Sequence, residues 1–447
     1  MNFDLPESIK VVLKKFENEK FEIYIVGGAV RDLIMGKIVN DWDFTTNAAP
    51  EEILKVIPGG FYDNDFGTVG LSVEGEINPF EITTYRTEEG YSDSRHPDKI
   101  KWGKTLDEDL SRRDFTINSM AIDKDLKVID LYNGQKDIES KLIRAVGDAN
   151  QRFSEDALRM MRAVRIASEL GFTIEEKTFE AIKKNASLIN KIAKERIKDE
   201  LFKIISSANP YDGIVLFRES GLCQEILPEL EKCFGVEQKS PGRHHIYDVG
   251  THLLESLKSC KSEDVITRFA TLIHDIGKPQ TYKKLATGTI TFYNHEMVST
   301  KIAESIADRL RFSKKEKDKF ITLVRWHQFT VDEHQTDSAI RRILRNVGLE
   351  NMDDMLALRV ADRLGGGARE TSWRLEEFKS RLVEVQKQPF SIKDLKINGN
   401  DVMKELNMKP GKEIGEILNK IFEEVVEKKT ENEREELLKR LASIPKS

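Results

Sequence analysis

Gly27-Gly-Ala-Val-Arg-Asp32, followed closely by Asp41-Trp-Asp43-Phe44, is the stretch that decides how the amino-terminal part of this chain folds. The apolar run Phe21-Glu-Ile-Tyr-Ile-Val26 directly before it predicts a short buried strand, so the glycine pair stands between a strand and a helix. On a strand, residues i and i+2 project from the same face, so Asp41 and Asp43 can present two carboxylates to one point. Hard oxygen ligands placed in this way predict a Mg²⁺ site.

Apolar patterns on either side of this motif extend the fold prediction. Further short strands are expected at 67–73, 79–85, 118–122 and 127–131, so residues 1–140 should form an α+β head, a small mixed sheet with helices. From Ser154 onward the apolar spacing is helical almost to the end, with a strand-like exception at 289–293. The rest of the chain is therefore expected to be all-α.

Composition limits the class of protein. The chain has 447 residues, 39% hydrophobic and 33% charged, which predicts several soluble domains. No apolar run approaches the roughly 20 residues of a membrane helix, and the first residues lack a signal-peptide pattern, so a cytoplasmic protein is expected. Cys223, Cys233 and Cys260 form no C-x-x-C pair and predict no zinc site. A net charge of −6 permits a local basic groove for nucleic acid.

The glycine–aspartate motif also predicts nucleotide chemistry. Gly27 and Gly28 would let backbone N–H groups approach a triphosphate, which Arg31 could grip with both of its terminal nitrogens. Two Mg²⁺ ions held by the paired aspartates would activate an attacking hydroxyl and steady a leaving pyrophosphate. Glu81, on another expected strand, is a candidate third catalytic carboxylate. The alternative is an ordinary strand-to-helix turn followed by two surface aspartates.

Together with two later segments, this motif resembles a known family. It is similar to the head motif of class II tRNA nucleotidyltransferases and bacterial poly(A) polymerases. Arg112-Arg-Asp-Phe-Thr-Ile-Asn118 resembles the family's ribose- and triphosphate-contacting motif, and Glu155-Asp-Ala-Leu-Arg159-Met-Met-Arg162 resembles its base-reading helix. The nucleotide-binding residues that this resemblance implies are Gly27, Gly28, Arg31, Arg112, Arg113, Asp114, Asn118, Asp156, Arg159 and Arg162.

The residue types of the last segment support base reading independently. Ser154 is expected to cap a helix on which Asp156 and Arg159, three residues apart, share one face. Acceptors on the carboxylate and donors on the guanidinium can pair with the Watson–Crick edge of cytosine or adenine, so protein can replace a template. The alternative for these two residues is a surface ion pair.

Two segments bear on which member of the family this chain resembles. The stretch 66–75 stands where bacterial poly(A) polymerases carry an extra arginine-rich segment, and the polar stretch 87–98 resembles the flexible loop kept by CCA-adding and A-adding members. Addition of CCA to tRNA 3′ ends from CTP and ATP is therefore expected, with A-only addition or poly(A) synthesis as alternatives.

Basic residues between 183 and 198 would suit the tRNA backbone, although interspersed acids also fit a solvated face.

A second chemical constellation lies towards the carboxyl end. Seven of the eight histidines fall between 244 and 334, and imidazoles combined with carboxylates suit Mn²⁺, Fe²⁺, Co²⁺ or Ni²⁺. The pattern resembles the HD phosphohydrolase superfamily. That resemblance implies a metal site formed by His252, His274, Asp275 and Asp362, with His295 and His327 where dinuclear members place two more ligands.

The chemistry implied for this site is hydrolysis of a phosphate ester by metal-bound water, with Lys278 helping to hold the anion. The alternative is a catalytically inactive domain that is retained as a tRNA-binding surface. For the whole chain, two other classes of protein are alternatives. Alarmone synthetase/hydrolases also join a transferase to an HD hydrolase, but they place the hydrolase domain first. A catalytically inactive RNA-binding protein would not need intact carboxylates.

The sequence therefore predicts four domains. They are a nucleotidyltransferase head (1–140), a helical neck that binds the nucleotide base and tRNA (141–240), an HD phosphohydrolase-like domain (241–367) and a helical tail (368–447). The boundary near 240 rests on the helix-breaking pair Pro241-Gly242, and the weaker one near 367 on three consecutive glycines. The expected partners are tRNA, CTP and ATP, with no membrane and no stable protein partner inferable.

Overall fold

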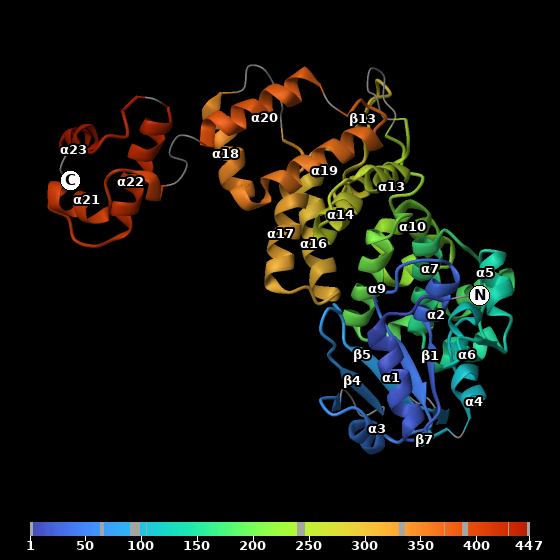
Figure 1. Cartoon of the computed structure of the whole chain (residues 1–447). Helices are drawn as coiled ribbons and strands as arrows, with labels where there is room; N and C mark the ends of the chain where they lie inside the picture. Colours follow the sequence, from blue (N-terminus) through green and yellow to red (C-terminus); the bar gives the residue numbers. More distant parts are fainter. Residues whose placement is uncertain are drawn as a thin grey trace. The chain divides into compact units, whose positions relative to one another are not determined.

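The computed structural model describes residues 3–62, 67–89, 99–103, 105–238, 246–329, 336–370, 372–386, 392–427 and 429–444. The chain forms two compact units, one made of residues 1–231 with 309–311 and the other of 232–308 with 312–447. Figure 1 shows the strands β1, β4 and β5 of the first unit in blue and its later helices, among them α9 and α10, in green. In the described residues, no helix has the length and apolar character needed to cross a membrane.

A seven-stranded mixed sheet in the order β3-β4-β5-β2-β1-β8-β9 organises the beginning of the first unit. Its strands are β1 (Ile23–Val26), β2 (Asp43–Thr46), β3 (Phe61–Tyr62), β4 (Thr68–Leu71), β5 (Phe80–Thr84), β8 (Met120–Ile122) and β9 (Val128–Asp130). Strand β2 is antiparallel to β1 and parallel to β5, so Asp43 is the register partner of both Val26 and Glu81. The sheet thereby places the expected catalytic carboxylates on neighbouring strands.

Each expected strand corresponds to one of these elements but is shorter in the structure than expected. Residues 118–122 were expected to be extended, but Thr116–Asn118 forms a 3₁₀ turn and β8 begins only at Met120. Outside the main sheet, β6 (Arg86–Glu89) pairs with β7 (Lys99–Trp102), and β10 (Leu142–Ile143) pairs with β11 (Thr173–Ile174).

Helices make up the rest of the first unit. They are α1 (Glu7–Asn18), α2 (Gly28–Ile34), α3 (Pro50–Val56), α4 (Leu106–Ser111), α5 (Gly134–Glu139), α6 (Ala149–Glu155), α7 (Leu158–Leu170), α8 (Glu176–Asn185), α9 (Lys194–Ser206), α10 (Pro210–Glu219), α11 (Leu222–Ile226) and α12 (Pro228–Glu231). Helix α7 packs on α9 and α10 and buries Met160, Met161 and Val164 completely. The core therefore takes one face of α7 and leaves the other for polar residues.

The second unit is helical, as expected, apart from the short pair β12 (Lys283–Lys284) and β13 (Ile290–Thr291). Its helices are α13 (Val249–Ser259), α14 (Val265–Ile273), α15 (Lys278–Thr281), α16 (His295–Arg309), α17 (Lys314–Trp326), α18 (Asp337–Val347), α19 (Met352–Gly365), α20 (Trp373–Gln386), α21 (Gly399–Leu406), α22 (Lys412–Val426) and α23 (Arg434–Ala442). Helices α13, α14, α17 and α19 pack together, and α21–α23 share a separate apolar core.

Candidate active site and metal cluster

The turn between β1 and α2 brings the backbone close to a catalytic carboxylate. Gly27 has φ +74°, and a Cβ there would lie 3.1 Å from Asp43 Oδ2 and 3.2 Å from Arg113 Nη1. An L side chain would be strained by that φ and would also displace the carboxylate. Glycine at this position therefore keeps Asp43 and Arg113 against the turn.

Asp41 and Asp43 both line a cavity of about 640 Å³. Asp41 is exposed and precedes β2, whereas Asp43 is half-buried at the beginning of that strand. Burial raises the pKa of Asp43; Arg113 opposes this effect and Asp41 adds to it. Glu81 stands next to Asp43 in the sheet register but is exposed and does not line the cavity. The two aspartates thus line the cavity from the beginning of β2 and the residues just before it, and not from one strand as expected.

A chain of hydrogen bonds joins the three sequence motifs around this cavity. Arg31 Nη1 donates to Asn118 Oδ1 (2.9 Å), Asn118 Nδ2 donates to Asp114 Oδ1 (3.3 Å), and Arg162 Nε donates to Asp114 Oδ2 (2.7 Å). Burial raises the pKa of Asp114, but Arg162 and Arg159 outweigh it and hold that pKa at about 2. The ionised carboxylate therefore fixes the positions of cationic side chains from different elements.

The base-reading segment differs from the expected helix. Ser154 lies inside α6 rather than capping a helix, and Asp156 is an extended residue between α6 and α7 whose Oδ1 accepts from Leu158 N at 2.9 Å. A carboxylate that accepts a nearby backbone N–H stabilises a helix start and competes with helix continuation, which explains the break. Asp156 consequently does not share a helix face with Arg159.

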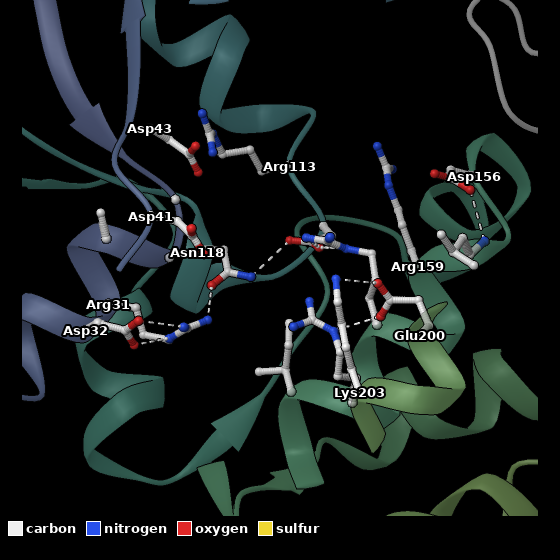
Figure 2. Close-up of a pocket in the computed structure, with 18 of the residues that line it drawn as sticks. Arg31, Asp32, Asp41, Asp43, Arg113, Asn118, Asp156, Arg159, Glu200 and Lys203 are labelled. Atoms are coloured by element: carbon white, nitrogen blue, oxygen red, sulfur yellow. Dashed lines mark hydrogen bonds and ion pairs between the residues drawn. The ribbon is translucent and has the colours of Figure 1, made fainter. Parts of the chain in front are cut away.

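Both expected base readers are already paired within the chain. Asp156 Oδ2 accepts from Arg196 Nη2 at 3.2 Å. Arg159 Nη1 donates to Glu155 Oε2 at 2.8 Å, and its Nη2 donates to the Arg112 carbonyl at 3.0 Å. In Figure 2, Asp156 and Arg159 lie on one side of the cavity, with Asp43 and Arg113 on the other. Both sets of side chains line one cavity.

The cavity includes residues that the sequence did not single out for nucleotide binding: Arg165, Arg196, Asp199, Glu200 and Lys203. Glu200 is buried, and its Oε2 accepts from Arg165 Nε at 2.7 Å. The spacing of Arg159, Arg162 and Arg165 in steps of three was a signal that could have identified Arg165. Among the basic residues expected to contact tRNA, Lys183 pairs with Glu180.

In the second unit, α13, α14, α16, α17 and α19 bring all six expected metal ligands together. His252 Nε2 lies 3.3 Å from Asp362 Oδ1, and His274 Nε2 lies 3.4 Å from Asp275 Oδ2. On the other side, Asp275 Oδ1 lies 3.1 Å from His295 Nε2 and 3.4 Å from His327 Nε2. Residues separated by more than 100 positions in sequence thus form one cluster, centred on Asp275.

Three imidazoles of the cluster are oriented by backbone carbonyls. The Nδ1 atoms of His274, His295 and His327 lie 2.7, 2.8 and 2.7 Å from the carbonyl oxygens of Thr271, Phe292 and Val324. An Nδ1–H that donates to a carbonyl leaves the Nε2 lone pair directed at the cluster, which is the usual arrangement of metal-binding histidines. The donor set and its orientation therefore fit a divalent cation.

Charge in the cluster also favours a cation. Burial lowers the pKa of His274, but the carboxylates of Asp275 and Asp362 outweigh it and raise the pKa to about 10. Lys278 Nζ lies 2.5 Å from Asp275 Oδ2 and is buried, and it helps to hold the pKa of Asp275 well below its usual range despite burial. A divalent cation would compete with protons for these imidazoles.

Some sequence-based expectations fall outside the described residues. Most of the loop expected at 87–98 does, although Arg86–Glu89 and Lys99–Trp102 are described as paired strands on either side of 90–98. Phe66 and three histidines of the carboxyl-terminal group, His244, His245 and His334, are also outside the described residues.

Comparison with known proteins identifies the class of protein. A model of the poly A polymerase head domain matches residues 23–144, one described as "Probable RNA and SrmB- binding site of polymerase A" matches 171–234, and one for domain 2 of tRNA nucleotidyltransferase matches 287–441. The fold and the matched regions define a nucleotidyltransferase with a mixed-sheet head and a helical body.

The relatives narrow this class. A CCA-adding enzyme of Ligilactobacillus salivarius is 34% identical over 97% of this chain and 96% of its own length, and one of Limosilactobacillus reuteri is 48% identical over 49% of this chain and 54% of its own. The structure of the Bacillus stearothermophilus CCA-adding enzyme in complex with CTP matches with a TM-score of 0.73 and 27% identity, covering 97% of this chain and 95% of that one. The chain belongs to the CCA-adding enzyme family.

Proposed function

We propose that this chain adds CCA to the 3′ ends of tRNA, taking CTP and then ATP without a nucleic-acid template. The observation that carries the proposal is a cavity lined by Asp41, Asp43, several arginines and Asp156, in a member of the CCA-adding enzyme family. The relative with a solved structure was crystallised with CTP, which fits the same substrate class. Addition of A alone and poly(A) synthesis are the alternatives that the test must separate.

In this reaction the tRNA 3′ hydroxyl loses its proton to water as its oxygen bonds to the α-phosphorus, the bond between that phosphorus and the bridging oxygen breaks, and pyrophosphate leaves. Asp41 and Asp43 would hold two Mg²⁺, which lower the charge barrier to the displacement when bound. Arg31, held by Asn118, and Arg113, beside Asp43, would contact the triphosphate. Asp156 and Arg159 would exchange their present partners for the edge of cytosine or adenine.

The decisive experiment is a nucleotide-by-nucleotide incorporation assay on tRNA ending at the discriminator base, with labelled CTP and ATP supplied separately and together. Two C residues and then one A are expected for the wild type, and no incorporation for Asp43→Ala. Adenylation of any RNA without use of CTP would contradict the proposal. Addition of A only to tRNA that already ends in CC would establish A-only addition.

A second function is favoured by the histidine–aspartate cluster, which would hold a transition metal such as Mn²⁺, Fe²⁺, Co²⁺ or Ni²⁺. We infer that it hydrolyses a phosphate ester: water oxygen bonds to phosphorus, one P–O ester bond breaks, and the leaving oxygen takes a proton. Bound metal supplies a more acidic water. The chain's own contribution is the orientation of the imidazoles and the placing of Lys278 at the edge of the cavity.

Hydrolysis is tested with 2′,3′-cyclic nucleotides and phosphomonoesters in the presence of Mn²⁺ or Ni²⁺. Turnover is expected for the wild type and a large loss for His274→Ala and Asp275→Ala. Equal turnover by those variants would assign the activity to a contaminant and leave the cluster a binding surface.

The division into four domains at 140, 240 and 367 and the cytoplasmic location stay predictions.

A further inference from the structure

The cavity beside the histidine–aspartate cluster shares part of its lining with a second one. The first cavity, about 590 Å³, reaches Asp275, His295 and His327, and the second, about 520 Å³, is lined by residues including Phe329 and Trp373. Gln328, Arg359 and Arg363 line both. Each volume is in the range of about 300–1,000 Å³ that small-molecule sites occupy. A ligand larger than a single phosphate ester could therefore lie in both cavities at once.

The shared wall is cationic. Arg359 Nη1 donates to Asp362 Oδ2 at 2.8 Å, so this guanidinium is held at the edge of the metal cluster. Arg363, one turn further along α19, lines both cavities, and its Nε is buried without a hydrogen-bond partner among the described residues. A buried guanidinium nitrogen without a partner is costly and fits a position that an anion completes. Planar guanidinium groups suit phosphate in particular.

Each cavity also carries an exposed aromatic ring. Tyr293, in the turn between β13 and α16, is 76% exposed and lines the first cavity, whereas Trp373, at the start of α20, is 62% exposed and lines the second. Large exposed rings next to guanidinium groups are the features by which proteins stack the bases of single-stranded nucleic acid. The cationic wall thus lies between two possible stacking surfaces.

We propose that the two cavities bind two successive nucleosides of one nucleic-acid strand. The end phosphate would lie at the cluster, the base of its nucleoside against Tyr293, the linking phosphodiester on Arg363, and the next base against Trp373. This inference rests on the hydrolase function proposed above for the position of the reacting phosphate, and it adds that the substrate is a strand end rather than a mononucleotide. A nucleoside polyphosphate would use the arginines but leave Trp373 without a base.

The experiment compares two probes on the full chain: adenosine 2′,3′-cyclic phosphate and the dinucleotide ApA ending in the same cyclic phosphate. With Mn²⁺, the dinucleotide is expected to have a KM about tenfold lower, the effect of one stacked base. The ratio of the two KM values should fall to about one in Arg363→Gln and in Trp373→Ala. Arg369→Gln, an exposed arginine that lines neither cavity, is the matched control and should keep the wild-type ratio.

Binding is read separately from turnover by tryptophan fluorescence in EDTA. Quenching that the wild type shows and Trp373→Phe lacks is assigned to Trp373. The dinucleotide should cause this Trp373 quenching in the wild type but not in Arg363→Gln. Because Trp373 is mostly exposed, its replacement is expected to leave thermal unfolding unchanged, which is checked for every variant.

Different outcomes would contradict the hydrolase function and the proposal that the two cavities bind a nucleic-acid strand. Quenching without turnover of either probe would remove the hydrolase function and support the second cavity as a nucleoside site. Turnover with equal KM values and no Trp373 quenching would overturn the strand proposal and keep the hydrolase. If ATP quenches as the dinucleotide does, and its binding depends on Arg363 but not on the Trp373 ring, the site binds polyphosphate and the strand proposal is wrong.

Discussion

The two carboxylates of the head and the two of the second unit concentrate negative charge in different surroundings. Asp41 is exposed and Asp43 half-buried at the edge of a 640 Å³ cavity, whereas Asp275 is buried among imidazoles. An open pair suits a cation that arrives and leaves with each nucleotide. An enclosed set with oriented imidazoles suits a cation that stays, because leaving would expose buried charge.

The largest expected effect tests whether the two sites work independently. Asp43→Ala should reduce CCA addition by about a thousandfold or more, because a metal ligand at the reacting phosphate is removed, and should leave phosphate-ester hydrolysis intact. His274→Ala should do the reverse. Both activities are measured on the same preparations. Loss of both activities in either variant would show that the two sites are coupled or that the variant is misfolded. Circular dichroism would distinguish a misfolded variant from a folded one.

A smaller expected effect, on thermal unfolding, tests whether the cluster of the second unit holds its cation when no nucleotide is present. Without nucleotide, Mn²⁺ at about a hundredfold excess over its Kd should stabilise the second unit by about 2.7 kcal/mol, because only the folded cluster binds it. The expected signal is a rise in the unfolding temperature of that unit, absent in His274→Ala and kept in Asp43→Asn. Equal stabilisation of the His274→Ala protein would place the binding elsewhere.

The smallest effect concerns the network that joins the head motifs. Asp114→Asn should cost about 2 kcal/mol of unfolding free energy at neutral pH, because charge-assisted bonds to a buried carboxylate contribute about 1.5–3 kcal/mol. The pKa of Asp114 is lowered from 3.8 to about 2, so its ionised form stabilises the fold above pH 4. The difference between wild type and variant should be constant above that pH and shrink as the pH falls from about 4 to 2.

Denaturant unfolding at several pH values measures this difference. Arg162→Gln removes the partner of the same carboxylate and serves as a companion variant, since it should show the same narrowing between pH 4 and 2. A difference that grows as the pH falls would contradict the assignment of Asp114 as an ionised, paired group.

Several site residues could be predicted because their signals are local. The strand before Gly27 follows from its apolar run, and all the proposed cluster ligands are named by their residue types. The expectation that Asp41 and Asp43 lie on one strand was wrong, because β2 begins only at Asp43 and Asp41 precedes it. The base-reading segment was predicted wrongly as a continuous helix. Its break depends on a competition between Asp156 and the backbone that residue types alone do not resolve.

The sequence by itself determined the α+β head, the helical body and the two sets of side chains proposed to bind metal, since these rest on periodicity and residue chemistry. Only the tertiary structure decided which distant residues meet. It placed buried Glu200 beside Arg165, left Glu81 outside the lining of the 640 Å³ cavity, and set Trp373 in a cavity that shares Arg359 and Arg363 with the one at the cluster. Such meetings depend on how helices pack, and a local pattern does not encode them because long-range contacts are a property of the whole fold.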